Sequence, residues 1–109
     1  MTDRDRQIVA EFRERLLGET LTHVRRIIIY GSRLRDDAPE DSDLDIMVLV
    51  DEMVPGLEER LDEAAYSVMW EHDFRPVLSL KVFTEDRYRS ALARGYSFYR
   101  NVEREGIAA

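Results

Sequence analysis

The chain has 109 residues, of which 44% are apolar and 36% are charged. Because a chain of this length can bury only one sizeable hydrophobic core, we expect a single domain over residues 1–109. No apolar run approaches the roughly 20 residues of a membrane-spanning helix, and no hydrophobic stretch follows the charged N-terminal residues. We therefore expect no membrane insertion or secretion, and a cytoplasmic protein. The absence of cysteine excludes disulfides, thiolate metal sites and cysteine nucleophiles.

The negative charge is concentrated in one segment. Eight of the 23 acidic residues lie between residues 36 and 52, where no basic residue occurs, and the whole chain carries a net charge of −7. Such a segment attracts cations and repels the phosphate backbone of nucleic acids, so we expect no direct nucleic-acid binding. Among the 16 basic residues only Lys81 is a lysine. The forked donors of an arginine side chain suit phosphate oxygens better than a lysine does, although a base-composition bias in the coding sequence would give the same excess of arginine.

The first half of the chain predicts one helix and two strands. Apolar residues at helical spacing predict a helix of about four turns that ends at Gly18, a candidate C-cap; they are Ile8, Val9, Phe12, Leu16 and Leu17. Residues 24–30 and 46–50 contain continuous apolar runs, which are typical of strands buried on both faces. The polar segment between these strands has no helical periodicity, so we expect them to be antiparallel neighbours.

The second half predicts three helices and one strand. Apolar spacing predicts a helix over residues 55–71, and residues 77–82 are typical of a third strand. Thr84 is a candidate N-cap for a helix that runs to Ala93, and a last short helix ends at Gly106. The predicted fold class is α/β (α+β), with a small mixed sheet of three or four strands packed with about four helices.

The most specific segment begins where the first predicted strand ends. Gly31 lets the backbone approach a ligand closely, and Ser32 offers a hydroxyl and an amide donor, which indicates a phosphate-binding turn. Asp43 and Asp45 lie at the entrance to the second strand, two residues apart, and should therefore point to one face. A divalent cation would relieve their repulsion, and oxygen ligands favour Mg²⁺ or Mn²⁺ with phosphate oxygens completing the shell.

The same residues also allow other interpretations. A Gly-Ser pair after a strand is usually only a turn, and a lone Asp-x-Asp is usually solvated. The acidic spacing also fits a calcium-binding EF-hand loop, but Ile46 stands where this loop needs glycine. The glycine-rich loop of P-loop proteins is absent. His23 and His72 have no partners at ligand spacing, and we expect each to be a surface or strand-edge residue.

The spacing of the motif resembles that of a known family. Gly31-Ser32, ten intervening residues and then Asp43-Leu44-Asp45 leading into an apolar strand are similar to the signature of the polymerase-β-like nucleotidyltransferases. The short chain and its C-terminal sequence resemble the minimal nucleotidyltransferase (MNT) subfamily. This resemblance implies the nucleotidyltransferase fold.

The resemblance also implies roles for individual residues. Asp43 and Asp45 would bind Mg²⁺ or Mn²⁺ as the catalytic aspartates. Ser32, together with Gly31, would hold the triphosphate of the nucleotide. Either Arg33 or Arg35 would assist this contact, although both arginines could equally be solvated.

The third carboxylate of the family has no counterpart in the sequence. Active family members supply it from the strand that here spans residues 76–82, where no acidic residue occurs. Ser79 is the nearest candidate for its position, while Asp73 and Glu85 lie outside the strand and could serve only if a loop folded back. In the family this acid acts as the base for the acceptor hydroxyl or helps to hold the metal. Its absence predicts a lower rate even where nucleotide binds.

The resemblance implies transfer of AMP from ATP to a hydroxyl group. MNT proteins are typically paired with a small helical HEPN-domain protein as antitoxin and toxin, and the MNT protein AMPylates a tyrosine of the HEPN ribonuclease. Larger relatives close over the substrate with a second helical domain, which this chain lacks, so we expect a partner to supply the missing wall. The alternatives are a catalytically weak nucleotide-binding antitoxin that neutralises its partner by contact, and a small-molecule nucleotidyltransferase that works as a homodimer.

Overall fold

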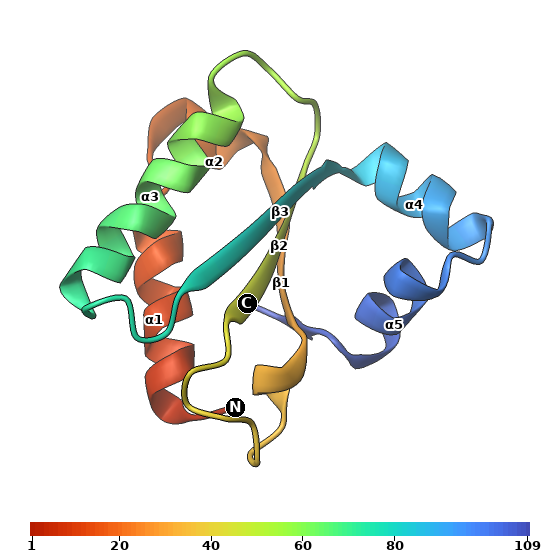
Figure 1. The fold of residues 1–109 in the computed structure, drawn as a ribbon. Helices are drawn as coiled ribbons and strands as arrows, with labels where there is room; N and C mark the ends of the chain where they lie inside the picture. Colours follow the sequence, from red (N-terminus) through yellow and green to blue (C-terminus); the bar gives the residue numbers. More distant parts are fainter.

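The computed structural model describes residues 1–109 and arranges them around one four-stranded sheet (Figure 1). The strands lie in the order β3-β2-β1-β4, and their bounds are β1 (Val24–Tyr30), β2 (Leu44–Val50), β3 (Leu78–Thr84) and β4 (Ile107–Ala108). β1 is antiparallel to both β2 and β4, whereas β2 and β3 are parallel. The predicted mixed sheet and its antiparallel first pair are confirmed. The short β4 was not predicted, because two residues carry no periodicity.

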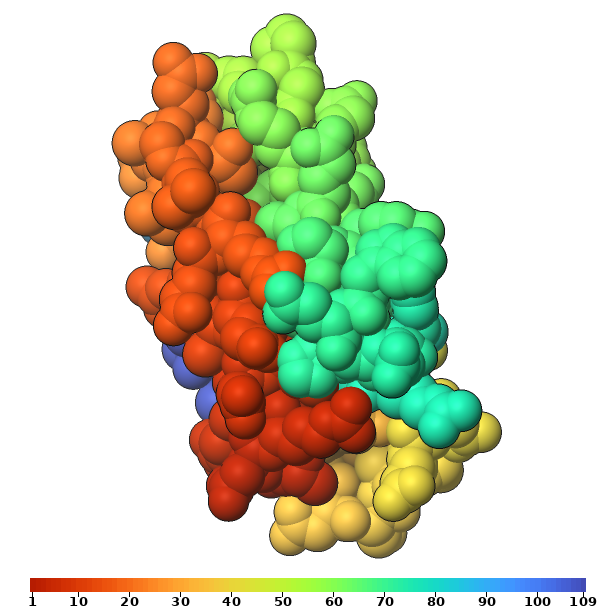
Figure 2. All heavy atoms as spheres, turned by 90° about the vertical axis from the view of Figure 1, so that its left-hand side faces the viewer, coloured from red at the N-terminus to blue at the C-terminus, as the bar shows by residue number.

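One face of the sheet is covered by α1 (Asp3–Glu14), α2 (Gly18–His23) and α3 (Leu57–Glu71). Because side chains alternate along a strand, every second residue of β1 and β2 points to this layer. Figure 2 shows α1 and α3 side by side over this face. A cluster of 16 buried residues forms the core there. Its members from β1 and β2 are Ile27, Ile29, Leu44, Ile46, Val48 and Val50.

The opposite face is covered by α4 (Glu85–Ala93) and α5 (Ser97–Glu105). Its core is smaller and comprises Ile28, Tyr30, Met47, Leu49, Tyr88 and Val102. Strand alternation places Asp45, Ser79 and Lys81 on this same face. Asp45 and Ser79 are half-buried and Lys81 is exposed, so the α4–α5 layer leaves this part of the face open to solvent.

The end of the first helix differs from the prediction. Gly18, with a φ of 55°, begins α2 and does not cap α1, so the predicted C-cap is wrong. Leu16 and Leu17 fit the helical spacing of apolar residues but lie beyond the end of α1. Leu16 is nevertheless only 1% exposed and packs in the core, whereas Leu17 is 73% exposed. The predicted N-cap at Thr84 is confirmed, since its hydroxyl accepts a hydrogen bond from the Arg87 amide at 3.2 Å. None of the helices combines the length and the apolarity that a membrane crossing requires.

Candidate active site

The turn after β1 brings the backbone against a carboxylate. Gly31 has a φ of 86°, in the left-handed region that favours glycine, and the 3₁₀ helix Ser32–Leu34 follows it. A Cβ atom at Gly31 would overlap Oδ2 of Asp45. This contact follows from the pairing of β1 with β2, in which Tyr30 stands opposite Asp45. The glycine and the second aspartate of the predicted motif therefore meet in the fold.

The two aspartates of the motif form a local concentration of negative charge. Asp43 immediately precedes β2 and is exposed, whereas Asp45 is half-buried. Burial raises the pKa of Asp45, the charge of Asp43 raises it further, and the charge of Lys81 opposes this rise. No hydrogen bond stabilises the ionised Asp45 carboxylate. A cation placed between the two carboxylates would therefore relieve a repulsion that Lys81 compensates only in part.

β3 brings a serine and a lysine to the same place. Ser79 is the register partner of Asp45 in the parallel pair of β2 and β3, and neighbouring strands lie about 4.8 Å apart. Ser79 therefore stands beside Asp45, and its assignment to the position of the family's third carboxylate stays a prediction. Lys81 lies two residues further along β3 on the same face, paired with Met47. Sequence reasoning missed Lys81, because only the register of the β2–β3 pair brings it near Asp45.

Comparison with protein families matches residues 6–93 to the nucleotidyltransferase domain family. The chain belongs to this family. The match runs from α1 to the end of α4 and includes both halves of the motif. The four-stranded mixed sheet with helices on both faces agrees with the predicted nucleotidyltransferase fold. No curated protein and no solved structure matches the chain significantly.

Nucleotidyltransferase domains generally act on a nucleoside triphosphate with a divalent metal, and the donor set of this domain fits that use. Asp43 and Asp45 supply carboxylate oxygens, the ligands that Mg²⁺ prefers. No third acidic or histidine side chain joins them in a group able to hold a metal by itself, so neither Asp73 nor Glu85 fills the vacant place. Glu85 follows the last residue of β3, whereas Ser79, the partner of Asp45, lies near the first residue of this strand. Phosphate oxygens and water would complete the coordination.

The side chain of Arg33 is committed to contacts within the domain. Its Nη2 lies 2.9 Å from Oδ1 of Asp5, and the two side chains are 11% and 3% exposed. Its Nη1 donates hydrogen bonds to the carbonyls of Glu40 and Ser42 at 2.9 and 3.0 Å. Arg33 thus ties α1 to the loop that leads to Asp43. A contact between Arg33 and a triphosphate stays a prediction, and it would require some of these bonds to break.

Arg35 is less constrained than Arg33. Its side chain is 71% exposed and approaches only Asp37, at 3.6 Å. Because an exposed pair of this kind contributes little to stability, Arg35 can turn toward a bound phosphate at small cost. Of the two arginines, Arg35 is therefore the one whose guanidinium is available to a nucleotide.

The buried ion pair of Arg33 and Asp5 allows a test of the structural role of Arg33. We expect Asp5→Asn to lower the free energy of unfolding by about 3 kcal/mol, because it leaves the buried Arg33 guanidinium without its counter-charge. The matched control is Asp37→Asn at the exposed pair, for which the change should stay below about 0.5 kcal/mol. Urea unfolding of both variants measures the difference, and equal small losses would contradict a structural role for Arg33.

The close approach of Gly31 to Asp45 gives a second test. We expect Gly31→Ala to displace the Asp45 side chain and so to abolish metal-dependent nucleotide binding, in addition to the backbone strain of a positive φ. Gly18→Ala is the control, because Gly18 also has a positive φ but nothing within 4 Å of an added Cβ. Calorimetric titration with nucleotide and Mg²⁺ compares the two variants. Unchanged nucleotide binding by Gly31→Ala would show that the contact is not needed.

A shallow pocket of about 270 Å³ opens beside the turn, lined by Tyr30, Gly31, Phe98, Asn101, Val102 and Glu105. The rings of Tyr30 and Phe98 pack edge to face, with centroids 5.7 Å apart. The Tyr30 hydroxyl is buried and has no hydrogen-bond partner. Burial and the charge of Asp45 raise the pKa of Tyr30 to about 12, so the hydroxyl keeps its proton at neutral pH.

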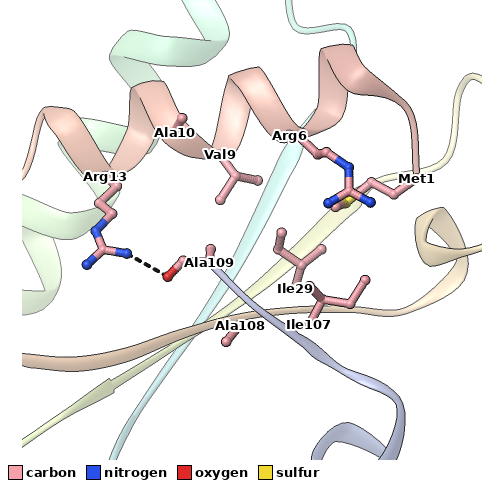
Figure 3. Close-up of a pocket in the computed structure, with 9 residues that line it drawn as sticks. All are labelled: Met1, Arg6, Val9, Ala10, Arg13, Ile29, Ile107, Ala108 and Ala109. Atoms are coloured by element: carbon pink, nitrogen blue, oxygen red, sulfur yellow. Dashed lines mark hydrogen bonds between the residues drawn. The ribbon is translucent and has the colours of Figure 1, made fainter.

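A second pocket, of about 280 Å³ and mostly apolar, lies between α1 and the C-terminal segment (Figure 3). Its lining includes Val9 and Ile29, which belong to the core on the α1–α3 side of the sheet. Arg13 closes one side of it by donating a hydrogen bond to the carbonyl of Ala109 at 2.6 Å. This pocket is therefore on the face away from Asp45, and we assign it no part in the site.

Proposed function

We propose that this nucleotidyltransferase domain transfers AMP from ATP to a hydroxyl group, with Mg²⁺ or Mn²⁺ as its metal. The observation that carries the proposal is the contact between Gly31 and Asp45. Phosphates held at the Gly31-Ser32 turn would lie directly beside a carboxylate that can bind the metal. The choice of ATP as the nucleotide rests on the resemblance to MNT proteins.

Each residue of the site has its own role in the proposed reaction. Asp43 and Asp45 would hold the metal, which when bound neutralises negative charge on the phosphates. The Ser32 hydroxyl and the amides of the turn would hold phosphate oxygens, and Arg35 can add a positive charge. Ser79 is the candidate for the position from which the family would supply a base, but a serine hydroxyl does not accept a proton at neutral pH. The acceptor therefore has to lose its proton without a carboxylate from β3.

The proposed acceptor is a tyrosine of a HEPN-type helical ribonuclease, so that the domain acts as the antitoxin of a cytoplasmic toxin–antitoxin pair. The support for this partner is the resemblance to MNT proteins. The open face around Ser79 and Lys81 would admit a side chain presented by another protein.

Mass spectrometry of the intact proteins tests the proposal. The domain is incubated with ATP, Mg²⁺ and a HEPN-type protein encoded beside it. The expected result is a partner whose mass has increased by one AMP, with the adduct on a tyrosine. Chelation of the metal and the variant Asp45→Asn are both expected to prevent the adduct. A partner that stays unmodified while its ribonuclease activity is unaffected would contradict the proposal.

A second candidate function is favoured by the serine at position 79. With no carboxylate on β3, the domain could bind nucleotide and neutralise its partner by contact alone. The same experiment separates the two functions, since contact alone would inhibit the ribonuclease without any change in its mass. Modification of a small-molecule hydroxyl in the absence of a partner would instead identify a small-molecule nucleotidyltransferase.

A further inference from the structure

A separate polar pocket of about 290 Å³ lies at the corner where α4 meets α5, at the right of Figure 1. It is lined by Arg87, Ser90, Ala91, Arg94, Tyr96 and Tyr99. None of these residues lines the pocket beside Asp45, and none belongs to the motif. The roles proposed above leave this pocket without a ligand.

The pocket holds positive charge that nothing in the chain neutralises. Neither Arg87 nor Arg94 forms an ion pair, although the chain as a whole carries a net charge of −7. Arg89, on the same helix but outside the pocket, does pair with Glu85. Two arginines that line one cavity and form no ion pair are suited to a phosphate, whose oxygens accept forked hydrogen bonds.

Aromatic contacts fix the walls around these two arginines. The Tyr99 ring packs against Phe83 and Tyr88, with centroid separations of 5.6 and 5.9 Å. The Arg87 guanidinium lies over the Phe83 ring at 5.2 Å. Tyr96, which is 53% exposed, presents a second aromatic ring at the mouth of the pocket. The pocket thus combines a preformed aromatic wall with charged donors.

We infer that this pocket binds a nucleoside 5′-phosphate without a metal. Arg87 and Arg94 would hold the phosphate, the Ser90 hydroxyl would donate to it, and the base would stack against the exposed ring of Tyr96. A volume near the lower end of the roughly 300–1,000 Å³ typical of ligand pockets favours a mononucleotide over a larger ligand. The negative net charge of the chain disfavours a polyanion such as RNA. This binding site does not depend on the proposed transferase activity.

Titration of ¹⁵N-labelled protein with AMP in EDTA, followed by NMR, tests the inference without engaging a metal site. The expected result is saturable shifts of the amide signals of residues 87–99. Arg87→Gln and Arg94→Gln should each raise the Kd for AMP by about tenfold, as expected for loss of a charge-assisted hydrogen bond. The control Arg89→Gln, on the same helix but outside the pocket, should leave the Kd unchanged. The dispersed spectrum of each variant verifies that it is folded.

Four further arms define what would overturn the inference. Inorganic phosphate should bind more weakly than AMP, and Tyr96→Ala should weaken AMP binding without affecting phosphate. Equal binding of AMP and phosphate, or tighter binding of a short RNA, would contradict a mononucleotide site. Asp45→Asn should bind AMP here as well as the parent does, which keeps this result separate from the transferase proposal. The absence of saturable shifts at millimolar AMP would also overturn it.

Discussion

Asp43→Asn and Asp45→Asn are each expected to lower nucleotidyl transfer by about 10²–10³-fold and to abolish Mg²⁺-dependent binding of ATP. Each change removes one of the two carboxylates able to hold the metal, while the side chain keeps its size. The fold should survive, because removing one of two like charges relieves the repulsion between them. Calorimetric titration with ATP in Mg²⁺ and in EDTA measures the loss of binding, and a single-turnover assay measures the loss of transfer.

The control for this experiment is an acidic residue of the same segment that lies on the surface. Glu52 is exposed just beyond the end of β2 far from Asp45, and Glu52→Gln removes the same charge from the chain without touching the site. It should leave ATP binding nearly unchanged. If the parent bound ATP equally well in EDTA, Asp43 and Asp45 would not be metal ligands.

The raised pKa of Asp45 fixes the sign of a pH effect on stability. In the folded state Asp45 holds its proton to a higher pH than its ordinary pKa of 3.8 would allow. Between the pKa of Asp45 in the unfolded state and its higher pKa in the folded state, the folded state therefore binds more protons than the unfolded state. The free energy of unfolding falls as the pH rises through this window. Asp45→Asn should remove this fall. The variant should thus unfold at higher urea than the parent at neutral pH, and the difference should shrink below the unfolded pKa of Asp45.

The elements that the sequence predicts well are those whose own residues carry the signal. Three elements are predicted directly, because the burial of each one shows in its own residues. They are β1 with its isoleucine run, β2 with its apolar run and α3 with its helical spacing. Thr84 predicts the start of α4 for the same local reason. The Gly18 prediction failed because Leu16 satisfies the helical spacing while it packs into the core as part of a loop.

The parts of the site that escaped prediction depend on contacts between distant residues. The motif predicts that Gly31 admits a ligand, but the carboxylate that would collide with a side chain there comes from the next strand. Arg33 could be assigned to phosphate or to solvent from sequence, since its partner Asp5 belongs to α1. The nearness of Lys81 to Asp45 requires the register of the parallel strands, which no local pattern encodes.

Ser79→Asp is expected to raise the rate of AMP transfer by up to about 10²–10⁴-fold, the range of a general base. The reason is its place in the sheet: Ser79 is the register partner of Asp45, so an aspartate there would complete a cluster of three carboxylates. The same change should lower stability in the absence of metal, because it adds a third negative charge to a half-buried site. Single-turnover transfer measures the rate, and urea unfolding with and without Mg²⁺ measures the stability.

Ser79→Asn separates the effect of charge from the effect of shape. Asparagine has nearly the size of aspartate but can neither accept the acceptor's proton nor bind a cation through a charged oxygen, so it should not raise the rate. Equal gains in both variants would mean that the larger side chain only closes the site. Robust transfer by the parent and none by Ser79→Asp would place the base elsewhere. Because Asp73 and Glu85 do not join the two aspartates, the partner that carries the acceptor would then be the next candidate source of that base.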